Sequence, residues 1–374
     1  MTKAYSIFLT VLFTVFIGGV LVISALLPKE EFSEMENRFL QKPPELSIET
    51  VKNGKFMENS EKYVSDHIAG RDLWVAAKAW GERLSGKQEN NGVYFVKEDT
   101  LLNRLDEPDY DTLITSAGYV NDLVYNLNVP VYFGIIPSST EIWSDRLPAG
   151  APNASQTAIL EQAKAAVPGA SWADLYTPLW EHKGEDIFYR TDHHWTSLGA
   201  YYGYTALMEA MGMEAAPLDE SAKVTVSDSF YGTTFSTSGV RWVAPDHIDR
   251  YISGDGVKVT GYPEGSPVES SLYVDSYLDK KDKYSSFLGG NQPLCVIETE
   301  HTDAPKVLVI RDSYSDSLAP FLTQSFSEIH LFDTRMNKTS IKAYVEENQI
   351  DQVVVLYSIS NFISSSKDMF LLGR

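Results

Sequence analysis

The sequence predicts an α/β protein with a mainly parallel sheet, preceded by an apolar N-terminal helix. Three observations carry this prediction. Helical and strand-like segments alternate from Tyr110 to Tyr357, a rhythm typical of parallel sheets. The run from Ala4 to Leu27 contains no charged residue. Between about 224 and 300 the alternation gives way to a segment rich in Ser, Gly, Thr, Tyr and Val, which indicates a β-rich insertion.

The N-terminal run is long enough to cross a membrane. It extends over 24 residues from Ala4 to Leu27, whereas about 20 apolar residues span a bilayer core. Lys3 precedes it, so the positive-inside rule leaves the N-terminus in the cytoplasm and the rest of the chain outside. A cleaved signal peptide is the alternative, but its apolar core is about 7–15 residues long and Ser24-Ala25 is a poor cleavage site. We therefore expect an uncleaved transmembrane anchor over residues 1–28.

Residues 29–105 are expected to form a juxtamembrane linker and a helical region. The stretch from Lys29 to Pro44 is charged and ends in two prolines, which stop a helix. From Phe56 to Leu84 apolar residues recur at helical spacing, interrupted at Gly70. A turn and the short strand Val93–Val96 follow.

An α/β domain is expected over residues 106–374, where helix, apolar strand and polar loop follow one another. The predicted helices are 110–127, 157–166, 197–211, 317–326 and 340–349. The predicted strands are 129–136, 171–175, 306–310, 328–332 and 352–357. Among these, 129–136, 306–310 and 352–357 should be central, because they are continuous apolar runs of the kind buried on both faces of a sheet.

The composition argues against nucleic acid as a partner and excludes an intrachain disulfide. The formal net charge is −20 and the pI is near 4.7, whereas nucleic-acid binding needs clustered Lys and Arg. We therefore expect no nucleic-acid partner. Cys295 is the only cysteine, so no intrachain disulfide can form. It lies in a strand-like run, which favours a buried structural thiol over a nucleophile. No cofactor is expected.

Two short segments carry the residue types of a serine nucleophile system. The first, 191–196, reads Thr-Asp-His-His-Trp-Thr, and the second, 311–315, reads Arg-Asp-Ser-Tyr-Ser directly after the strand-like run 306–310. A serine on the turn that leaves a buried parallel strand lies at the carboxyl edge of the sheet, where open α/β folds place their sites. Ser313 is therefore the candidate nucleophile.

The acid and the base would come from the first segment. Residues i and i+2 of an extended segment point to the same side. Asp192 should therefore lie beside His194 and orient its ring, while His193 points away. Together with Ser313 they make up the parts of a Ser–His–Asp system.

Two other interpretations of the Asp-His-His run remain open. Aspartate and histidine also bind zinc and iron, but no cysteine or further histidine-rich segment completes such a site, so we expect no metal. Alternatively, Asp192 caps a turn before a helix that starts near Thr196, and the two histidines are structural.

Taken in order, these segments resemble those of the DHHW protein family, which is named for the tetrapeptide at Asp192 to Trp195. Besides the two motifs, the resemblance rests on Glu36-Asn37-Arg38, Asp66–Arg71, Asn91–Tyr94, Pro137–Pro148 and Phe230–Thr233, and it covers nearly the whole chain. That family is similar to the alginate O-acetyltransferase proteins. The resemblance implies their fold, an SGNH-hydrolase-like three-layer sandwich with a permuted order of elements.

The same resemblance implies Ser313 as nucleophile, His194 as general base and Asp192 as its orienter. The order Asp, His, Ser along the chain differs from ordinary SGNH hydrolases, in which the serine comes first. Arg311 stands where many relatives carry glycine, and a positive φ there would strain an arginine. Backbone N–H groups at Ser313 and its neighbours should hold the oxyanion, with Arg311 and Tyr314 as further candidates for oxyanion or substrate binding.

The implied function is a membrane-anchored, extracytoplasmic O-acyltransferase or esterase that acts on a cell-surface or exported polysaccharide. Because the domain would lie outside, cytosolic acetyl-CoA cannot be its donor, so a membrane-bound O-acyltransferase that passes acyl groups across is the expected partner. A non-catalytic glycan-binding or assembly protein of the same fold is the alternative. The aromatic residues considered for stacking on a sugar are Trp143, Trp195, Tyr231 and Trp242, and core packing is an equal alternative for each.

Overall fold

The structure is a computed structural model that describes residues 3–33, 35–36, 38–364 and 366–373. The chain divides into two compact units. The first comprises residues 1–91 and 236–242, and the second comprises residues 92–235 and 243–374. The apolar N-terminal segment belongs to the first unit, and both sequence motifs belong to the second.

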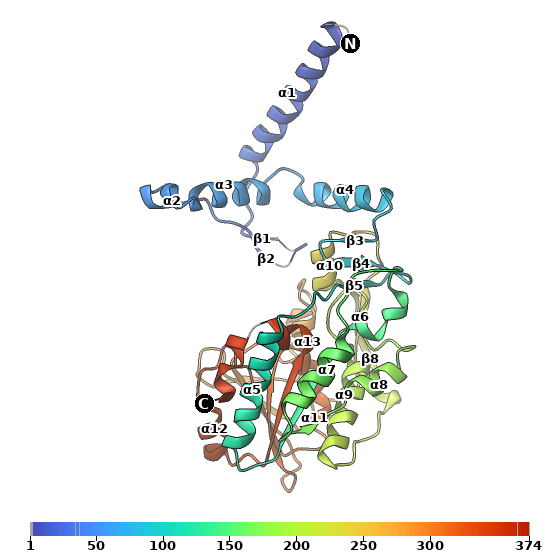
Figure 1. Cartoon of the computed structure of the whole chain (residues 1–374), viewed down its shortest axis with the longest axis vertical. Helices are drawn as coiled ribbons and strands as arrows, with labels where there is room; N and C mark the ends of the chain where they lie inside the picture. The colour runs from blue at the N-terminus through green and yellow to red at the C-terminus, as the bar shows by residue number, and fades with distance from the viewer. Residues whose placement is uncertain (1–2, 34, 37, 365, 374) are drawn as a thin grey trace. The chain divides into compact units, whose positions relative to one another are not determined.

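The first unit is mainly helical (Figure 1). Its described elements are α1 Lys3–Leu26, β1 Phe32–Ser33, β2 Arg38–Phe39, α2 Ile48–Lys52, α3 Lys55–Asp66, α4 Arg71–Leu84 and β3 Glu89–Asn90. Helix α1 is long and apolar enough to cross a membrane. The interruption predicted at Gly70 separates α3 from α4, because Gly70 adopts a left-handed φ of 67° at the start of α4.

Two short strands are described within the charged stretch 29–44. Strands β1 and β2 pair within it in antiparallel fashion. Two of its charged side chains contact the helices that follow, since Arg38 forms an ion pair with Asp66 and Glu36 forms one with Arg71. These ion pairs join Glu36 and Arg38 to the end of α3 and the start of α4.

An eight-stranded sheet forms the centre of the second unit, in the order β11-β10-β12-β14-β13-β15-β6-β7. The bounds are β6 Val131–Ile136, β7 Ser171–Trp172, β10 Lys258–Gly261, β11 Val268–Ser270, β12 Leu294–Glu298, β13 Lys306–Arg311, β14 Glu328–Phe332 and β15 Gln352–Ser358. The five strands from β14 to β7 pair in parallel, whereas β12, β10 and β11 are joined by antiparallel pairs. The predicted mainly parallel sheet is confirmed.

The segment from about 224 to 300 is not wholly separate from this sheet. Strands β8 Val224–Phe230 and β9 Asp246–Arg250 form an antiparallel pair of their own. The other three strands of the segment, β10, β11 and β12, extend the main sheet from the edge of β14. The change in composition thus coincides with a change from parallel to antiparallel pairing. The edge of β14 would leave backbone N–H and C=O groups unpaired, and the antiparallel strand β12 satisfies them.

Helices cover both faces of the sheet. The second unit's helices are α5 Tyr110–Asn126, α6 Ser139–Ile142, α7 Gln156–Ala166, α8 Tyr176–Glu181, α9 Ser197–Met211, α11 Tyr314–Leu322, α12 Ile341–Asn348 and α13 Ile359–Ser364, and two short strands, β4 Val93–Phe95 and β5 Leu101–Asn103, pair with each other. Along β13, Val307 and Val309 pack with residues of α9 and α11. Leu308 and Ile310 pack on the other side with residues of α5, α7 and α12. This alternation produces a three-layer arrangement.

Candidate active site

Ser313 lies where the chain leaves the centre of the sheet. It follows β13 after a single residue and is the N-cap residue of α11, which begins at Tyr314 rather than at the predicted 317. Its neighbours Arg311 and Asp312 are fully buried, whereas Ser313 is half-buried. The serine hydroxyl thus stands at the carboxyl edge of a parallel sheet, on a turn whose two sides are anchored in the core.

Asp312 holds this turn in place. Its Oδ2 accepts hydrogen bonds from the backbone N–H of Ser358 at 2.8 Å, from the Ser358 hydroxyl at 2.7 Å and from Asn361 Nδ2 at 2.7 Å. Its Oδ1 accepts one from the Tyr314 N–H at 3.1 Å. One buried carboxylate therefore joins the ends of β13 and β15 and the start of α11. The sequence analysis did not assign this role, although the residue lies inside the second motif.

His194 connects Ser313 to Asp192. The His194 Nε2 lies 2.8 Å from the Ser313 Oγ, and its Nδ1 lies 2.6 Å from the Asp192 Oδ1. The three side chains meet although 119 positions separate His194 from Ser313. Their order in space is the order in which acid, base and nucleophile stand in a serine hydrolase.

Asp192 is buried and accepts four hydrogen bonds. Its Oδ1 also accepts the His194 N–H at 3.0 Å, and its Oδ2 accepts the Thr233 N–H at 2.7 Å and the Thr233 hydroxyl at 2.8 Å. Burial alone raises the pKa of a carboxyl group, but His193, His194 and these hydrogen bonds hold the pKa of Asp192 well below its ordinary value. An ionised carboxylate only accepts, so the proton of the His194 ring lies on Nδ1 and Nε2 is left to accept the serine proton.

Gly232 permits this close approach of Thr233 to Asp192. A Cβ added at position 232 would lie 2.2 Å from the Asp192 Oδ2 and 2.3 Å from the Asp192 Cβ. No side chain fits there without moving the carboxylate. Gly232 and Thr233 belong to the Phe230–Thr233 fragment of the family resemblance, which was the available signal for their importance.

His193 does not point away from Asp192, so that expectation is wrong. Its Nδ1 lies 3.6 Å from the Asp192 Oδ1 and 2.6 Å from the Thr233 Oγ1, and its ring centroid is 3.8 Å from that of His194. The alternation rule fails because residues 190–194 form a bend and not an extended strand. Burial and the neighbouring His194 lower the pKa of His193 to about 4.

The structural alternative for Asp192 is supported in part, because the Asp192 Oδ1 accepts the His194 N–H and so caps the turn that precedes α9. The N-cap residue of α9 is Thr196, whose hydroxyl accepts a hydrogen bond from the Gly199 N–H at 3.2 Å. Asp192, His193 and His194 do present possible metal-ligand atoms within 4.8 Å of one another. Both oxygens of Asp192 and both ring nitrogens of His194 are, however, already engaged in the hydrogen bonds described above.

Tyr284 is a member of the site that the sequence analysis missed. Its ring stacks on that of His194, with centroids 3.8 Å apart and planes inclined by 7°. Its hydroxyl donates to the carbonyl of Ser313 at 2.9 Å. Burial raises the pKa of Tyr284 well above its ordinary value, so the hydroxyl remains a donor. Because Tyr284 comes from a short turn far from both motifs, no local pattern marked it.

Arg311 belongs to the framework beneath the site. Its side chain is completely buried, and its Nη1 forms an ion pair with Asp316 at 2.8 Å. Burial raises the pKa of Asp316 to about 6, an effect that Arg311 opposes. The backbone at Arg311 continues strand β13, so the strain anticipated for a positive φ does not arise. The Arg311 guanidinium is thus enclosed beside Asp316 and has no exposed surface.

The backbone donors that follow Ser313 are occupied. The Tyr314 N–H donates to the Asp312 Oδ1, and the Ser315 N–H donates to the Asp312 carbonyl at 3.2 Å. The expectation that neighbours of Ser313 supply oxyanion donors is therefore not favoured at these two positions. The Tyr314 hydroxyl donates to the backbone carbonyl of His193.

The four aromatic residues considered for sugar stacking all make packing contacts. Trp195 is completely buried, and its Nε1 donates to the Tyr314 carbonyl at 2.9 Å and the Ser317 hydroxyl at 3.0 Å. Trp143 is also buried. Trp242, in the first unit, packs against Trp80. Tyr231 is half-buried, with its ring 4.4 Å from that of Phe235.

A small polar cavity of about 100 Å³ adjoins the candidate site. His193 and Tyr314 line one side of it. The rest of the lining comes from the end of β5 and the two residues after it, from the start of α6, and from the end of β15 and the start of α13: Asn103, Arg104, Leu105, Ser138, Ser139, Thr140, Ser358, Ser360 and Asn361. The cavity therefore lies near the carboxyl ends of adjacent parallel strands, where a ligand of an α/β sheet is expected.

The fold and this constellation together define a three-layer α/β protein with a Ser–His–Asp arrangement at the carboxyl edge of its sheet. The chain belongs to the DHHW family: the family model described as DHHW protein matches residues 116–332, more than half of the chain. The match includes the Asp-His-His-Trp segment and extends through the Ser313 turn to the end of β14.

Known proteins resemble parts of the chain. A protein of Pseudomonas syringae pv. tomato described as probable alginate O-acetylase AlgJ is 26% identical over 181 residues, which are 46% of this chain and 46% of that protein. The match thus spans about half the length of this curated relative. Among solved structures, a DHHW family protein from Eubacterium siraeum has a TM-score of 0.67 at 24% identity and covers 75% of this chain and 95% of its own. Bacillus cereus PatB1 with a sulfonyl adduct has a TM-score of 0.63 at 21% identity, with 75% and 98% covered. Both structures share the fold.

Proposed function

We propose that the protein is an O-acyltransferase or esterase that acts on a cell-surface or exported polysaccharide through Ser313, His194 and Asp192. The observation that carries the proposal is the continuous contact from the Asp192 carboxylate through the His194 ring to the Ser313 hydroxyl, with distances of 2.6 Å and 2.8 Å. A nucleophile with a base in hydrogen-bond reach, and a base oriented by a third group, is the arrangement that activates a serine.

The reaction runs in two halves. His194 Nε2 takes the proton of the Ser313 hydroxyl while Oγ attacks the carbonyl carbon of an acyl ester. The bond from that carbon to the donor oxygen breaks, and the donor oxygen leaves with the proton held by His194. An acceptor hydroxyl then attacks the acyl-serine ester, gives its proton to His194, and Ser313 recovers it. A sugar hydroxyl as acceptor gives transfer, and water gives hydrolysis.

The relatives support the polysaccharide as substrate class. The P. syringae relative is described as a probable alginate O-acetylase. The sulfonyl adduct of PatB1 fits a protein with an activated nucleophile of the kind proposed here. At the level of these distant relatives, acyl transfer to a glycan is the activity that fits both the fold and the proposed roles of Ser313 and His194.

The small volume of the cavity favours a short acyl group as the group that is transferred. Its volume of about 100 Å³ is well below the roughly 300–1,000 Å³ of pockets that enclose a drug-sized ligand. It fits an acetyl group better than a sugar ring or a long acyl chain. We expect hydrolysis of p-nitrophenyl acetate to exceed that of the octanoate ester, when both are measured as kcat/KM. An equal or higher value for octanoate would contradict an acetyl-sized acyl site.

Helix α1 supports a location at the membrane. We propose that it is retained as an anchor, with the remainder of the chain on the outer side. An extracytoplasmic domain has no access to cytosolic acetyl-CoA, so a membrane-bound O-acyltransferase that carries acyl groups across would supply the donor. Purified protein alone should then show hydrolysis of small esters, and transfer to the polymer should require that partner.

The test is a pair of serine variants. Ser313→Ala should abolish hydrolysis of p-nitrophenyl acetate. Ser315→Ala should leave it within a few fold of wild type, because the Ser315 hydroxyl is buried and has no hydrogen-bond partner among the described residues. Asp192→Asn should cost on the order of 10⁴-fold or less. Unchanged turnover in Ser313→Ala would rule out the acyl-enzyme route and favour the alternative of a glycan-binding or assembly protein.

A covalent probe makes the test independent of turnover. An aryl sulfonyl fluoride should react with Ser313 as its Oγ bonds to sulfur, the S–F bond breaks, and fluoride leaves with the serine proton. Intact mass should rise by one sulfonyl group in wild type and Ser315→Ala, and not in Ser313→Ala or His194→Ala. Persistence of the adduct in Ser313→Ala would mean that another residue is the nucleophile. A chelator should leave both readouts unchanged, whereas loss of activity would favour a metal at Asp192, His193 and His194.

A further inference from the structure

Helix α4 presents an apolar face to solvent. Leu73, Ala77, Trp80 and Leu84 recur at intervals of three and four residues, so they lie along one side of the helix. Leu73 is 75% exposed, Trp80 47% and Leu84 83%, and Trp74 beside them is 48% exposed. Two large aliphatic and two tryptophan side chains thus remain exposed on a helix of only 14 residues. Contiguous exposure of this kind marks an interaction surface.

The opposite side of α4 packs on the chain itself. Ala79 is completely buried, and the Val75 side chain lies 3.1 Å from the position of a Cβ built on Gly239. Trp80 lies at the border between the two sides, since it is 47% exposed and also contacts Trp242, with ring centroids 4.3 Å apart. The helix is therefore already held to the first unit by one side. The side that carries Leu73 and Leu84 remains exposed and is available for a further contact.

The contacts between α4 and α1 indicate what kind of partner covers the exposed side of α4. The Trp74 ring lies 6.1 Å from the ring of Phe16, which belongs to the apolar helix. The Ala69 N–H donates to the Ser24 hydroxyl at 2.8 Å, and the Trp74 Nε1 donates to the Ala69 carbonyl at 3.1 Å. Phe16 is ten residues, or about 15 Å of helix rise, before the end of α1. Trp74 thus stands beside a part of α1 that is apolar all round.

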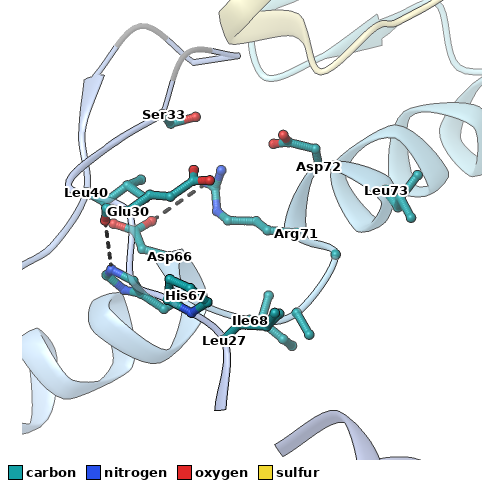
Figure 2. A pocket seen from close by; sticks show the side chains of 13 residues that line it. Leu27, Glu30, Ser33, Leu40, Asp66, His67, Ile68, Arg71, Asp72 and Leu73 are labelled. Carbon is teal, nitrogen blue, oxygen red and sulfur yellow. Dashed lines mark hydrogen bonds and ion pairs between the residues drawn. The ribbon is translucent and has the colours of Figure 1, made fainter. Parts of the chain in front are cut away.

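Side-chain contacts hold together the junction at which the end of α1 meets the end of α3 and the start of α4. Figure 2 shows Asp66 and Arg71 side by side where α3 ends and α4 begins, with Leu27 close to Ile68 at the end of α1. Glu36 forms an ion pair with Arg71 at 2.7 Å, and His67 contacts the Glu30 carbonyl at 3.2 Å. Within the first unit, α4 runs sideways from the end of α1 (Figure 1). A helix that lies in a membrane interface has this relation to a helix that crosses the membrane.

We infer that α4 is an interfacial helix whose Leu73, Trp74, Trp80 and Leu84 side chains insert into the outer surface of the lipid bilayer beside α1. This inference rests on the proposed anchoring by α1. Tryptophan is enriched at membrane–water interfaces, where its ring meets acyl chains and its N–H meets polar groups. The apolar face of α4 is continuous with that of α1 through Trp74 and Phe16, so lipid would cover both.

Charge is consistent with a lipid surface. Residues 42–87 contain eight Lys and Arg and seven Asp and Glu, whereas the whole chain has a net charge of −20. The acidity therefore lies outside this helical segment. An anionic membrane surface repels the rest of the molecule but not α4.

Spin labels on introduced cysteines test the inference in the full-length protein. The single native Cys295 is buried, so a nitroxide reagent will modify an introduced cysteine selectively. Leu84→Cys places the label on the apolar face of α4. Lys78→Cys is the matched control, because Lys78 is exposed and lies on the polar side of the same helix. Val15→Cys reports on the middle of α1, where the side chain is 67% exposed.

The three proteins are reconstituted in protein-free vesicles of phosphatidylethanolamine and phosphatidylglycerol, and collision of the label with oxygen is compared with collision with a water-soluble nickel chelate. We expect oxygen to dominate at positions 15 and 84 and nickel at position 78. Nickel dominance at 84 with oxygen dominance at 15 would overturn the interfacial helix while leaving the anchor intact, and would favour a membrane protein as the partner of this face. Nickel dominance at 15 would overturn the anchor and, with it, the inference for α4.

Discussion

Four hydrogen-bond donors from two segments converge on the Asp192 carboxylate: the backbone N–H and ring of His194, and the backbone N–H and hydroxyl of Thr233. Because each donor stabilises the ionised form, the pKa of Asp192 stays low in spite of its burial. The carboxylate in turn sets the tautomer of His194. At the scale of single residues, hydrogen bonds from Thr233 orient the Asp192 carboxylate, and that carboxylate orients the His194 ring.

Asp192→Asn should reveal this in the pH dependence of stability. A carboxyl group whose pKa is lowered by folding contributes its full stability above its unfolded pKa of about 3.9, and this contribution is lost as pH falls from there through the lower folded pKa. At pH 7 the variant should be less stable by about 1–3 kcal/mol, since hydrogen bonds to a charged group are lost. The difference should shrink below about pH 4. Urea unfolding at pH 7 and in acid measures it, and a difference that stays constant or widens in acid would contradict the lowered pKa.

Substitutions at Tyr284 can distinguish two contributions: the ring that orients His194 and the hydroxyl that donates to the Ser313 carbonyl. Tyr284→Phe keeps the ring stacked on His194 and loses the bond to the Ser313 carbonyl, so esterase kcat/KM should fall by about tenfold or less. Tyr284→Ala frees the His194 ring, and a base misplaced by about 1 Å can cost on the order of 10²-fold. Circular dichroism should show both variants folded. Equal losses in the two variants would mean that the hydroxyl, and not the ring, is what matters.

At the scale of elements, Trp195 joins the two motifs. Its Nε1 donates to the Tyr314 carbonyl and the Ser317 hydroxyl of α11, while its ring is buried against α9. The segment that carries His194 is thereby fixed to the helix that Ser313 begins. The tryptophan of the tetrapeptide is therefore a buried packing residue that holds the segment of His194 against the helix that follows Ser313.

Two glycine substitutions test the packing of α9 on this tryptophan. A Cβ at Gly203 would lie 2.6 Å from the Trp195 Cη2, so Gly203→Ala should destabilise the fold by about 1–3 kcal/mol. Gly118 in α5 has nothing within 4 Å of a built Cβ, so Gly118→Ala should stabilise by about 0.5–1 kcal/mol through helix propensity. Chemical denaturation of both variants measures the contrast. A neutral Gly203→Ala would show that Trp195 can shift freely, against the tight contact described.

At the scale of the whole molecule, the two units differ in character. The first carries the long apolar helix and the exposed face of α4, and the second carries the sheet and the candidate active site. The single cysteine belongs to the second unit and suits an oxidising compartment, since burial raises the pKa of Cys295 to about 12 and leaves the thiol unreactive.

Membrane topology follows from the charge around α1. With Lys3 ahead of an uncharged run, residues 29–374 should lie outside the cytoplasmic membrane. Protease added to intact spheroplasts should digest this part while a cytoplasmic marker protein survives. Carbonate washing should leave the undigested protein in the membrane fraction, as expected for a retained anchor. Protection of the domain in intact spheroplasts would reverse the topology, and release by carbonate would indicate cleavage after the apolar segment.

Features that depend on neighbours along the chain could be predicted from the sequence. Strand Glu328–Phe332 and helix Ser197–Met211 have the predicted bounds, because continuous apolar runs and helical spacing are local signals. The parallel core followed from the same alternation. His194 and Ser313 could be chosen because each lies in a short motif whose chemistry can be inferred without a structure.

The distant groups that complete the candidate site, and the burial of its aromatic side chains, could not be predicted from the sequence and became visible in the three-dimensional structure. Tyr284 and Asp312 act through contacts that depend on the path of the whole chain, and Trp195 is buried by helices that the motif does not contain. The bend at His193 is partly local, because the Asp192 side chain accepts the His194 N–H, and Thr233 then holds that carboxylate from outside the segment. The physical reason is common to all of them: local periodicity encodes secondary structure, whereas orientation and desolvation are properties of surroundings assembled from residues far apart in sequence.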